Sequence, residues 1–454
     1  MSDIAITTAA EPDGAPRIAS LDVLRGIAIL GILFMNINDM GASLWASFDD
    51  VRHIGWTAAD QVAWMIREVL ANGTARCLLE MLFGAGMVIL TDRVAEKTGK
   101  WRVLRAYAWR NIVLFAFGLV HVFILMWPGD ILHTYGLAAI VAVLFRRWRP
   151  QWLLTVGLLL ALLQLGGGGY SYLTVPGKRA EVARLEQAKA SGAKLTAAEQ
   201  KTLETGLKAR AERQKTRDEE KAKTIREDAA RSAATGTAMT WFAEQWRTFL
   251  WIQAQFFELL GVWEAAGTML IGAALYKWGV LQGSRSRRFY VIALVLGYGF
   301  GFTARFVGGL EQMQFSDAPK TIWATSEVSR LATTLGHVAL IHLLLASVGG
   351  ARLLKPFEAV GRTALTVYIL QTIICLWILY PPFALGLYGQ QGWAALMATA
   401  LAVNVALAFW ANWWVRDHRI APVEWAWRSI VEMRRLPIRK VARAPREGLA
   451  PLPA

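Results

Sequence analysis

The chain has 454 residues, of which 55% are hydrophobic and 21 are tryptophan, and it carries a formal net charge of +15. Several apolar runs reach the roughly 20 residues that a helix needs to cross a bilayer, which excludes a soluble domain. Lysine and arginine fall mostly in short loops between these runs, as the positive-inside rule expects, and this excludes a nucleic-acid partner. The two cysteines stand apart within apolar runs, so we expect neither a disulfide framework nor a metal site.

The two ends of the chain are predicted to be cytoplasmic tails. Residues 1–16 are polar and mildly acidic. They lack the basic start and the small-residue cleavage site of a signal peptide, so we expect a disordered tail. Residues 431–454 form a basic tail, which the positive-inside rule also places in the cytoplasm.

Between the tails, the apolar runs predict an all-α, polytopic membrane protein with about ten transmembrane helices. The predicted spans are 20–40, 75–91, 106–127, 130–146, 151–173, 256–276, 289–308, 328–348, 358–379 and 391–414. Basic loops alternate with less basic loops in this order, which places both termini on the cytoplasmic side. Two amphipathic stretches, 60–71 and 240–255, are predicted to lie in the membrane interface.

A charged insert divides the spans into two groups. Helices one to five lie in residues 17–176, helices six to ten in residues 238–430, and the insert occupies residues 177–237. The insert is rich in Ala, Glu, Lys and Arg and predicts two solvated helices broken at Ser191, the second opened by the capping-box letters TAAE. By alternation it faces outward as a helical hairpin, either a solvated one or an arm that docks a partner.

The first span, "LDVLRGIAILGILFMNI", contains three polar side chains. Asp22 and Arg25 are three residues apart, so they share a helix face at the cytoplasmic end. They form either an ion pair that holds the helix end or a site where the arginine meets an anionic, phosphate-bearing ligand. Gly26 allows the close approach of a backbone. Asn36 lies near the outer end, where an amide more often joins helices than takes part in chemistry.

Two histidines and an aspartate are predicted to meet near the outer leaflet. His121 lies inside the third span, and after a Pro-Gly turn Asp130 and His133 open the fourth. The cluster is either a general base with an orienting carboxylate or a hydrogen-bonded group that pins the hairpin. Two histidines and an aspartate also suit zinc, but no HExxH spacing supports a metal site. His53, in an outward loop, has no neighbour in sequence that makes it catalytic.

Other charged residues mark the remaining spans. Arg362 begins the ninth span on the cytoplasmic side, and residues 418–429, "HRIAPVEWAWRS", predict a short amphipathic stub at that surface. Charged residues also lie in three later spans, one nearer the middle of the sixth and the others at the outer level of the seventh and eighth, and we expect them to pair or to line a wet cavity. They are Glu264, Arg305, Glu311 and Arg330.

Five segments together resemble the YeiB-like family of bacterial membrane proteins, called domain of unknown function 418. They are "RIASLDVLRGIAILGILFMNI", "LLEMLFGAGM", "RNIVLFAFGLVHVFILMWPGDILHTYGL", "VGRTALTVYILQT" and "APVEWAWR". The resemblance covers nearly the whole chain outside the insert. It implies a multi-pass protein of the bacterial inner membrane.

A more distant resemblance concerns activity. The opening "LDVLRGIAI" is similar to that of the transmembrane acyltransferase superfamily, which includes heparan-alpha-glucosaminide N-acetyltransferase. Enzymes of this group move an acyl group from cytoplasmic acyl-CoA to an acceptor across the membrane. Their pattern can be laid on Asp22, Arg25, Gly26, Asn36, His53, Trp56 and Asp60. The loop before His53 is longer here, which leaves His121 as the competing base.

The resemblance implies a division of roles. Asp22, Arg25, Gly26 and Arg362 would bind acyl-CoA, with acetyl-CoA as the expected donor. His53 or His121 would be the base, with Asn36 as an oxyanion donor and Asp130 and His133 in support. The acceptor would be a periplasmic small molecule, glycan or lipid, and the superfamily also suggests a homodimer. Two alternatives stay open: a transporter that uses intramembrane ionisable residues, and a membrane scaffold or sensor.

Overall fold

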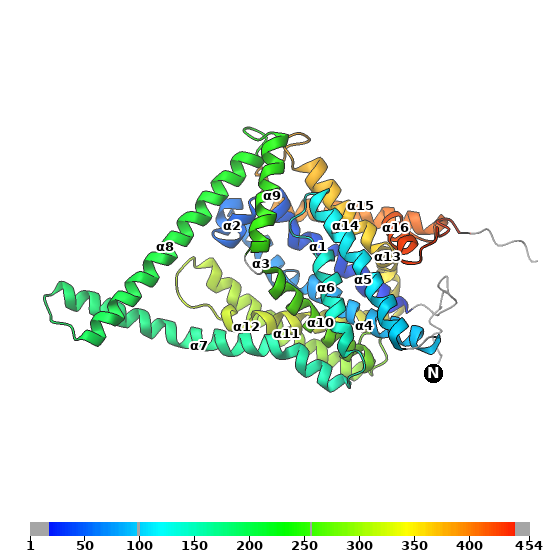
Figure 1. Cartoon of the computed structure of the whole chain (residues 1–454), viewed down its shortest axis with the longest axis horizontal. Helices are drawn as coiled ribbons and strands as arrows, with labels where there is room; N and C mark the ends of the chain where they lie inside the picture. The colour runs from blue at the N-terminus through cyan, green and yellow to red at the C-terminus, as the bar shows by residue number, and fades with distance from the viewer. Residues whose placement is uncertain (1–17, 98–99, 255–256, 441–454) are drawn as a thin grey trace, which may run out of the picture.

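Long helices make up most of the protein in the computed structural model, which describes residues 18–97, 100–254 and 257–440 (Figure 1). Over these residues the chain is all-α apart from one isolated bridge between His418 and Arg439. The tail predicted at 1–16 and most of the tail at 431–454 lie outside the described residues.

The helices are α1 (Ala19–Gly41), α2 (Leu44–Phe48), η1 (Val51–Ile54), α3 (Ala58–Leu70), α4 (Thr74–Lys97), α5 (Lys100–Phe123), α6 (Leu132–Ala142), η2 (Val143–Phe145), α7 (Pro150–Ala190), α8 (Ala197–Arg231), α9 (Ala238–Ala254), α10 (Phe257–Lys277), α11 (Arg287–Met313), α12 (Ile322–Leu345), α13 (Val348–Arg362), α14 (Ala364–Thr372), η3 (Ile373–Leu379), α15 (Trp393–Asp417) and α16 (Pro422–Val431).

Eight helices within the described ranges are long and apolar enough to cross a membrane, and a bent pair makes nine. The protein is therefore a multi-pass membrane protein, but the prediction of about ten spans was too high. The run at 130–146 contains α6, whose 11 residues rise only about 16 Å, too short for a hydrocarbon core of about 30 Å. The amphipathic stretches at 60–71 and 240–255 form α3 and α9.

The predicted ninth span is broken. Helix α13 and the helix formed by α14 and η3 meet at an angle of 77° around Thr363. Several charged side chains make α13 unsuitable for the bilayer interior, so the apolar segment begins only at Ala364. They are Arg352, Lys355, Glu358 and Arg362. The residues after Thr372 widen into a π-helix, η3.

The insert continues a span instead of starting a separate unit. Helix α7 runs for 41 residues without a break, through the four glycines at 166–169 and across the predicted boundary at residue 177. The chain reverses between α7 and α8, near Ser191 as predicted, and the capping box of Thr196 and Glu199 is confirmed. Figure 1 shows the resulting arm, which leaves the bundle along α7 and returns along α8 to α9.

Buried polar contacts fasten the returning end of the arm to the bundle. Glu227 on α8 accepts a hydrogen bond from Ser43 (2.6 Å) and pairs with Arg231 (2.5 Å). Arg231 in turn donates to the carbonyl oxygens of Asp39 and Met40 at the end of α1. Both charged side chains are at most 2% exposed. The arm is thus held against α1 by groups that have lost their contact with water.

Candidate functional site

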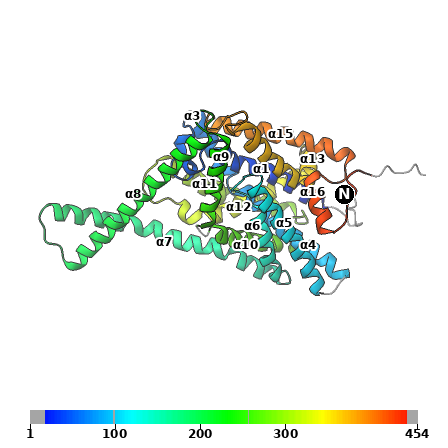
Figure 2. The same ribbon diagram turned by 45° about the horizontal axis from the view of Figure 1, so that its top comes forward.

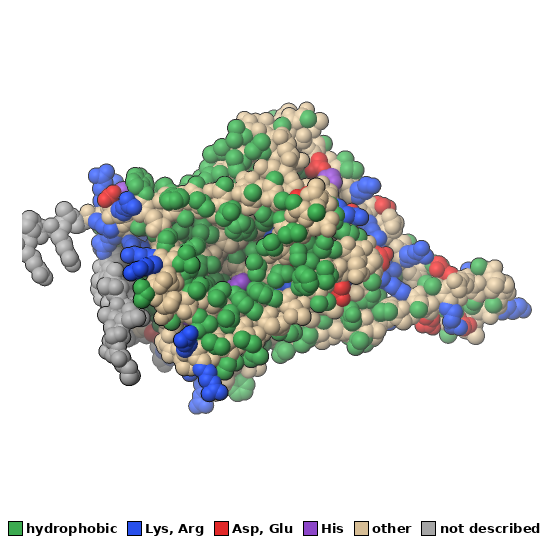
Figure 3. Space-filling view, turned by 180° about the vertical axis from the view of Figure 1, so that it is seen from behind, with side chains coloured by type: hydrophobic (Ala, Val, Ile, Leu, Met, Phe, Trp, Pro, Cys, Tyr) green, Lys and Arg blue, Asp and Glu red, His purple; other side chains and the backbone are tan. Residues whose placement is uncertain are grey.

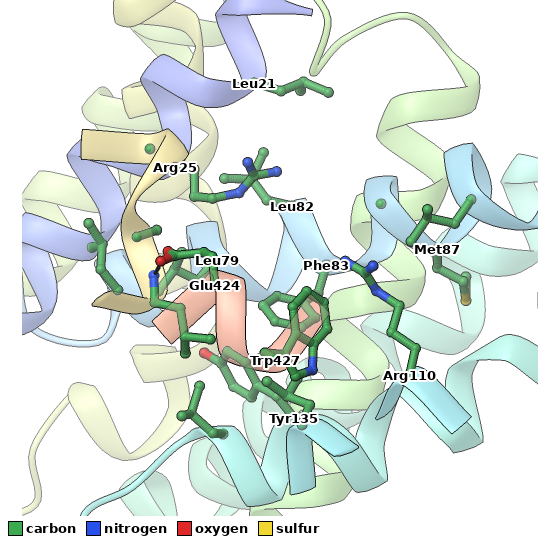
Figure 4. A pocket seen from close by; sticks show the side chains of 18 of the residues that line it. Leu21, Arg25, Leu79, Leu82, Phe83, Met87, Arg110, Tyr135, Glu424 and Trp427 are labelled. Carbon is green, nitrogen blue, oxygen red and sulfur yellow. Dashed lines mark hydrogen bonds between the residues drawn. The ribbon is translucent and has the colours of Figure 1, made fainter. Parts of the chain in front are cut away.

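A cavity of about 300 Å³ lies between helices that are far apart in the sequence, and Figure 4 shows it from close by. Its residues on α16 and α5 lie at the end of the bundle far from the arm in Figure 1. In both Figure 1 and Figure 2, α16 lies beside α5 at this end. The walls come from α1, α4, α5 and α6, together with α13, α14 and α16. The apolar part of the wall includes Ile29, Leu79, Leu82, Phe83, Met87 and Leu114. Such a volume is at the lower end of the range for small-molecule sites.

The cavity carries four guanidinium groups among its described lining residues. Arg25 on α1 pairs with Asp22 at 2.8 Å, which confirms the predicted ion pair. Arg362 ends α13, and Arg428 belongs to α16. Arg110 on α5 lies over the ring of Trp427, 4.1 Å from its centroid, as Figure 4 shows. Four segments far apart in the sequence therefore bring positive charge to one opening.

The carboxylates in the same wall are already engaged within the protein. Glu424 accepts hydrogen bonds from the amides of Leu365 (2.7 Å) and Thr366 (3.2 Å), and from the Thr366 hydroxyl. It thus caps the start of α14 beyond the helix break. Burial raises the pKa of Glu424, while these hydrogen bonds partly oppose the shift. The four guanidinium groups outnumber the two carboxylates, Asp22 and Glu424, so the described lining is net positive.

The segment that supplies Glu424 was predicted to be a short amphipathic stub, and it forms the ten-residue helix α16, whose buried face the prediction did not place at a site. Glu424 and Trp427 are each only 8% exposed, because α16 packs against α5 and α14. Sequence reasoning also missed Arg110 and Arg428 as part of the site. The sequence could have pointed to them, since Arg110 and Arg428 lie in the segments "RNIVLF…" and "APVEWAWR" that carry the family resemblance. Their separation along the chain hid their proximity.

Next to Tyr368, which lines the cavity, His121, Asp130 and His133 meet as predicted. The Nδ1 atoms of His121 and His133 lie 2.7 Å and 2.8 Å from the two carboxylate oxygens of Asp130. The His133 backbone amide donates to the same carboxylate at 3.0 Å. All three residues are buried. Asp130 therefore accepts hydrogen bonds on both oxygens, as a buried carboxylate requires.

A glycine on α5 makes this cluster possible. A Cβ on Gly118 would lie 2.3 Å from the backbone nitrogen of His133 and 2.8 Å from Oδ2 of Asp130. No side chain fits there, so the start of α6 packs directly on the α5 backbone. The eight-residue connection between α5 and α6 then brings Asp130 back to His121, nine residues earlier.

Tyr368 separates the cluster from the cavity. Its side chain lines the cavity, and its hydroxyl accepts from the Ile131 amide (3.3 Å) and donates to Oδ1 of Asp130 (3.4 Å). Its ring also packs edge-on against His121, with centroids 4.9 Å apart. On the far side, Nε2 of His121 lies 2.9 Å from the hydroxyl oxygen of Thr372. Tyr368 and Thr372 stand one turn apart on the same face of α14.

Three other residues of the predicted site lie outside the His121 cluster and are not among the described residues that line the cavity. Nε2 of His53 lies 2.6 Å from Oδ2 of Asp228 on the arm, and the His53 side chain is 46% exposed. Asn36 is half-buried on α1 and, like His53, is not among the described residues that line the cavity. Asp60 belongs to the capping box of α3 with Thr57. His53 and Asp60 therefore have partners of their own, Asp228 and Thr57, outside the His121 cluster.

Gly26 was predicted to allow the close approach of a backbone, and this is confirmed, since the backbone of α13 lies against it. A Cβ on Gly26 would lie 2.0 Å from the carbonyl oxygen of Phe357 on α13. The glycine therefore permits the close crossing of α1 and α13, which is a packing role. Through this crossing it positions Asp22 and Arg25 at the cavity without itself facing a ligand.

The outer-level charges form a second buried cluster. Arg330 lies 2.9 Å from Glu264 and 3.3 Å from Glu80, which joins α12 to α10 and α4. Arg305 donates to backbone carbonyls of α3, and Glu311 accepts from Thr321. The predicted pairing is confirmed for Arg330 and Glu264, whereas the hydrogen bonds of Arg305 and Glu311 go to uncharged groups.

The comparisons with known proteins agree with the architecture. The family model described as "Protein of unknown function (DUF418)" matches residues 275–434, which include α13, α14 and α16. The chain is 30% identical over 436 residues to the uncharacterized protein YxaH of Bacillus subtilis (strain 168), covering 93% of this chain and 96% of that protein. It is 27% identical over 420 residues to the uncharacterized protein YeiB of Escherichia coli (strain K12), covering 91% and 96%. The chain therefore belongs to the YeiB-like DUF418 family of proteins.

Proposed function

We propose that this protein is a membrane-embedded acyltransferase, which moves an acyl group from cytoplasmic acyl-CoA to an acceptor on the periplasmic side. One observation carries the proposal. A single cavity is lined by four guanidinium groups and by apolar side chains, and its lining residue Tyr368 contacts a histidine held by a carboxylate. This order of charge, apolar surface and base matches the order of phosphate, acyl chain and reacting carbonyl in an acyl-CoA.

The opening suits the phosphates of the donor. Arginine binds phosphate through paired, charge-assisted hydrogen bonds, and Arg25, Arg110, Arg362 and Arg428 come from four segments that surround the entrance. The cavity volume of about 300 Å³ is enough for the acyl and pantetheine part, with the nucleotide at the opening. Acetyl-CoA is the simplest donor of this class.

His121 is the base in this proposal. Its Nδ1 bonds to Asp130, which holds the ring and stabilises the positive charge that the ring gains on taking a proton. His53 is itself exposed and has a half-buried acidic partner, Asp228, on the arm instead. The acceptor would be a periplasmic small molecule, glycan or lipid.

The proposed orientation places both termini in the cytoplasm of a bacterium, with the protein in the inner membrane. Figure 3 supports this orientation, because Lys and Arg side chains gather near the grey termini and a broad apolar face separates them from the arm. The positive-inside rule assigns such an end to the cytoplasm. The cavity then opens toward the cytoplasmic pool of acyl-CoA.

Binding of acetyl-CoA to purified protein in detergent tests the proposal. We expect saturable binding by calorimetry, weakened about tenfold or more by Arg428→Ala, because a charge-assisted contact contributes about 1.5–3 kcal/mol. Arg434→Ala is the matched control, since Arg434 lies six residues further on and pairs with Glu432 at the surface. Well-folded protein that binds no acyl-CoA would refute the proposal.

A transporter is the second candidate, and the broken helix favours it. Discontinuous helices line the substrate sites of many transporters, and α13 and α14 meet at 77° beside the cavity. Reconstituted vesicles distinguish the two functions. A transporter moves an intact labelled solute across the vesicle wall, whereas an acyltransferase leaves the acyl label on an acceptor and releases free CoA thiol.

A further inference from the structure

Thr372, His121 and Asp130 form one continuous chain of hydrogen bonds. The Thr372 hydroxyl oxygen lies 2.9 Å from Nε2 of His121, and Nδ1 of the same ring lies 2.7 Å from Oδ1 of Asp130. Thr372 and His121 are both 0% exposed, and they come from α14 and α5, 251 residues apart. A hydroxyl, an imidazole and a carboxylate in this order are the parts of an activated nucleophile.

The hydrogen bonds determine which ring nitrogen carries the proton. An ionised carboxylate only accepts, so Nδ1 of His121 must donate to Asp130. In the neutral ring Nε2 is then an acceptor, and the Thr372 hydroxyl donates to it. The other oxygen of Asp130 is engaged by His133, which keeps the carboxylate turned toward His121. His121 is therefore oriented to take the Thr372 proton.

The backbone around Thr372 differs from that of an ordinary membrane helix. Helix α14 ends at Thr372, and the π-helix η3 begins at the next residue. π-Helical turns inside helices occur often at functional sites. Tyr368, one turn before Thr372 on the same face, lines the cavity and carries a hydroxyl that reaches Asp130. Thr372 thus lies one helical turn from a residue that lines the cavity.

We propose that Thr372 is the nucleophile of the acyltransferase and carries the acyl group as an ester between the two half-reactions. The inference rests on the proposed function and adds a covalent intermediate to it. Nothing in the family resemblance assigns a role to this residue. The donor is an acyl-CoA thioester, and the acceptor is a hydroxyl or amine compound.

In the first half-reaction, the Thr372 oxygen attacks the thioester carbonyl carbon while its proton passes to Nε2 of His121. The carbon–sulfur bond breaks, and His121 returns the proton to the sulfur, which leaves as CoA thiol. In the second half-reaction, the acceptor gives a proton to His121, and the oxygen or nitrogen of the acceptor attacks the carbonyl carbon of the ester. The bond to Thr372 breaks, and the proton returns to the threonine oxygen. Asp130 balances the charge on the imidazolium in both halves.

Tyr368 has a positioning role in this scheme. Its ring stands between the cavity and Thr372, so the acyl group reaches Thr372 when this ring turns aside. The 3.4 Å contact between its hydroxyl and Asp130 is long for a hydrogen bond. A hydroxyl held this weakly can exchange Asp130 for the carbonyl oxygen of the incoming thioester, where it would stabilise the developing negative charge.

Trapping the ester tests the inference. The full-length protein in detergent is incubated with acetyl-CoA labelled in the acetyl group, without an acceptor, and CoA release and peptide masses are followed. We expect one acetyl group on the peptide that contains Thr372, removable by hydroxylamine, and CoA released in equal amount. Thr372→Val should lower labelling at least a hundredfold, and Thr372→Ser should restore it, because serine keeps the hydroxyl.

Thr91→Val is the matched control. Thr91 is another buried threonine in a membrane helix, but its hydroxyl bonds only to carbonyls of its own helix, those of Met87 and Val88. It should label like the wild type. If the wild type transfers acetyl groups while Thr372→Val keeps the full rate, or if the label is found on His121, the covalent role of Thr372 is refuted and the proposed function stands. If the wild type binds no acetyl-CoA, both fail.

Discussion

Gly26 on α1 and Gly361 on α13 lie against each other's helix backbone. A Cβ on Gly361 would lie 1.8 Å from the carbonyl oxygen of Asp22, and the backbone nitrogens of the two glycines lie within 3.0 Å of the Cβ positions across the contact. The crossing brings the end of α13, with Arg362, next to Asp22 and Arg25. Two absent side chains therefore place three charged residues at one cavity.

Replacing Gly361 by alanine should separate α1 from α13. The neighbouring atom is backbone and cannot turn away, so we expect a loss of about 3 kcal/mol, as for other overpacked cores. Thermal unfolding in detergent measures the change, and acetyl-CoA binding should weaken with it. Gly349→Ala on the same helix has open space around it and should not destabilise the protein. Equal stability of the two variants would contradict the close crossing.

His121 and His53 should differ sharply in their effect on acyl transfer. His121→Ala removes the ring that bonds to both Asp130 and Thr372, so we expect the rate to fall at least a hundredfold. His53→Ala removes an exposed partner of Asp228 and should leave more than half of the rate. The measurement is CoA thiol release at saturating acetyl-CoA. If only His53→Ala greatly lowered the rate of CoA release, His53 would be the base instead of His121.

Arg231→Ala should loosen the arm. Removing one partner of a buried ion pair leaves Glu227 uncompensated, and such changes cost about 3 kcal/mol or more. Burial already raises the pKa of Glu227, so the carboxyl is poorly solvated. Limited proteolysis should cut the base of α8 faster in this variant. Arg210→Ala, which removes an exposed contact with Glu186, should be cut at the wild-type rate.

The contact between Arg217 on the arm and Asp317 in the loop before α12 should depend on pH. The hydrogen bond from Arg217 lowers the pKa of Asp317 below 3.8. Because the folded-state pKa is the lower one, the contact stabilises the arm fully above about pH 3.8 and is lost as the pH falls through the folded-state pKa. Both side chains are more than half exposed, so the effect should stay below about 1 kcal/mol.

Hydrogen exchange of α8 backbone amides, measured from pH 6 to pH 3, follows this contact. We expect faster opening at the acid end after correction for intrinsic exchange. In the Asp317→Asn variant, α8 should open equally at pH 6 and at pH 3, since the asparagine amide does not titrate. A wild type that shows no acid-dependent opening would mean that Arg217 and Asp317 do not hold the arm in solution.

Most of the helices could be predicted from local sequence. Runs of apolar residues specify membrane helices wherever they occur, and the reversal near Ser191 with its capping box follows from residues within one turn. The pairing of Asp22 with Arg25 and the meeting of His121 with Asp130 also join residues close in the chain. The short α6 and the bend at Thr363 were missed, because apolar length alone does not reveal a tight turn or a helix break.

The sequence by itself determined the class of protein, the helical insert and the histidine cluster, since each depends on composition or on neighbours along one hairpin. Only the tertiary structure decided that Arg110, Arg362 and Arg428 meet at one cavity, that His53 belongs to the arm contact, and that Thr372 bonds to His121. The reason is physical. Helix periodicity shows which side chains share a face, but which faces meet depends on close crossings such as that of Gly26 and Gly361, between residues hundreds of positions apart.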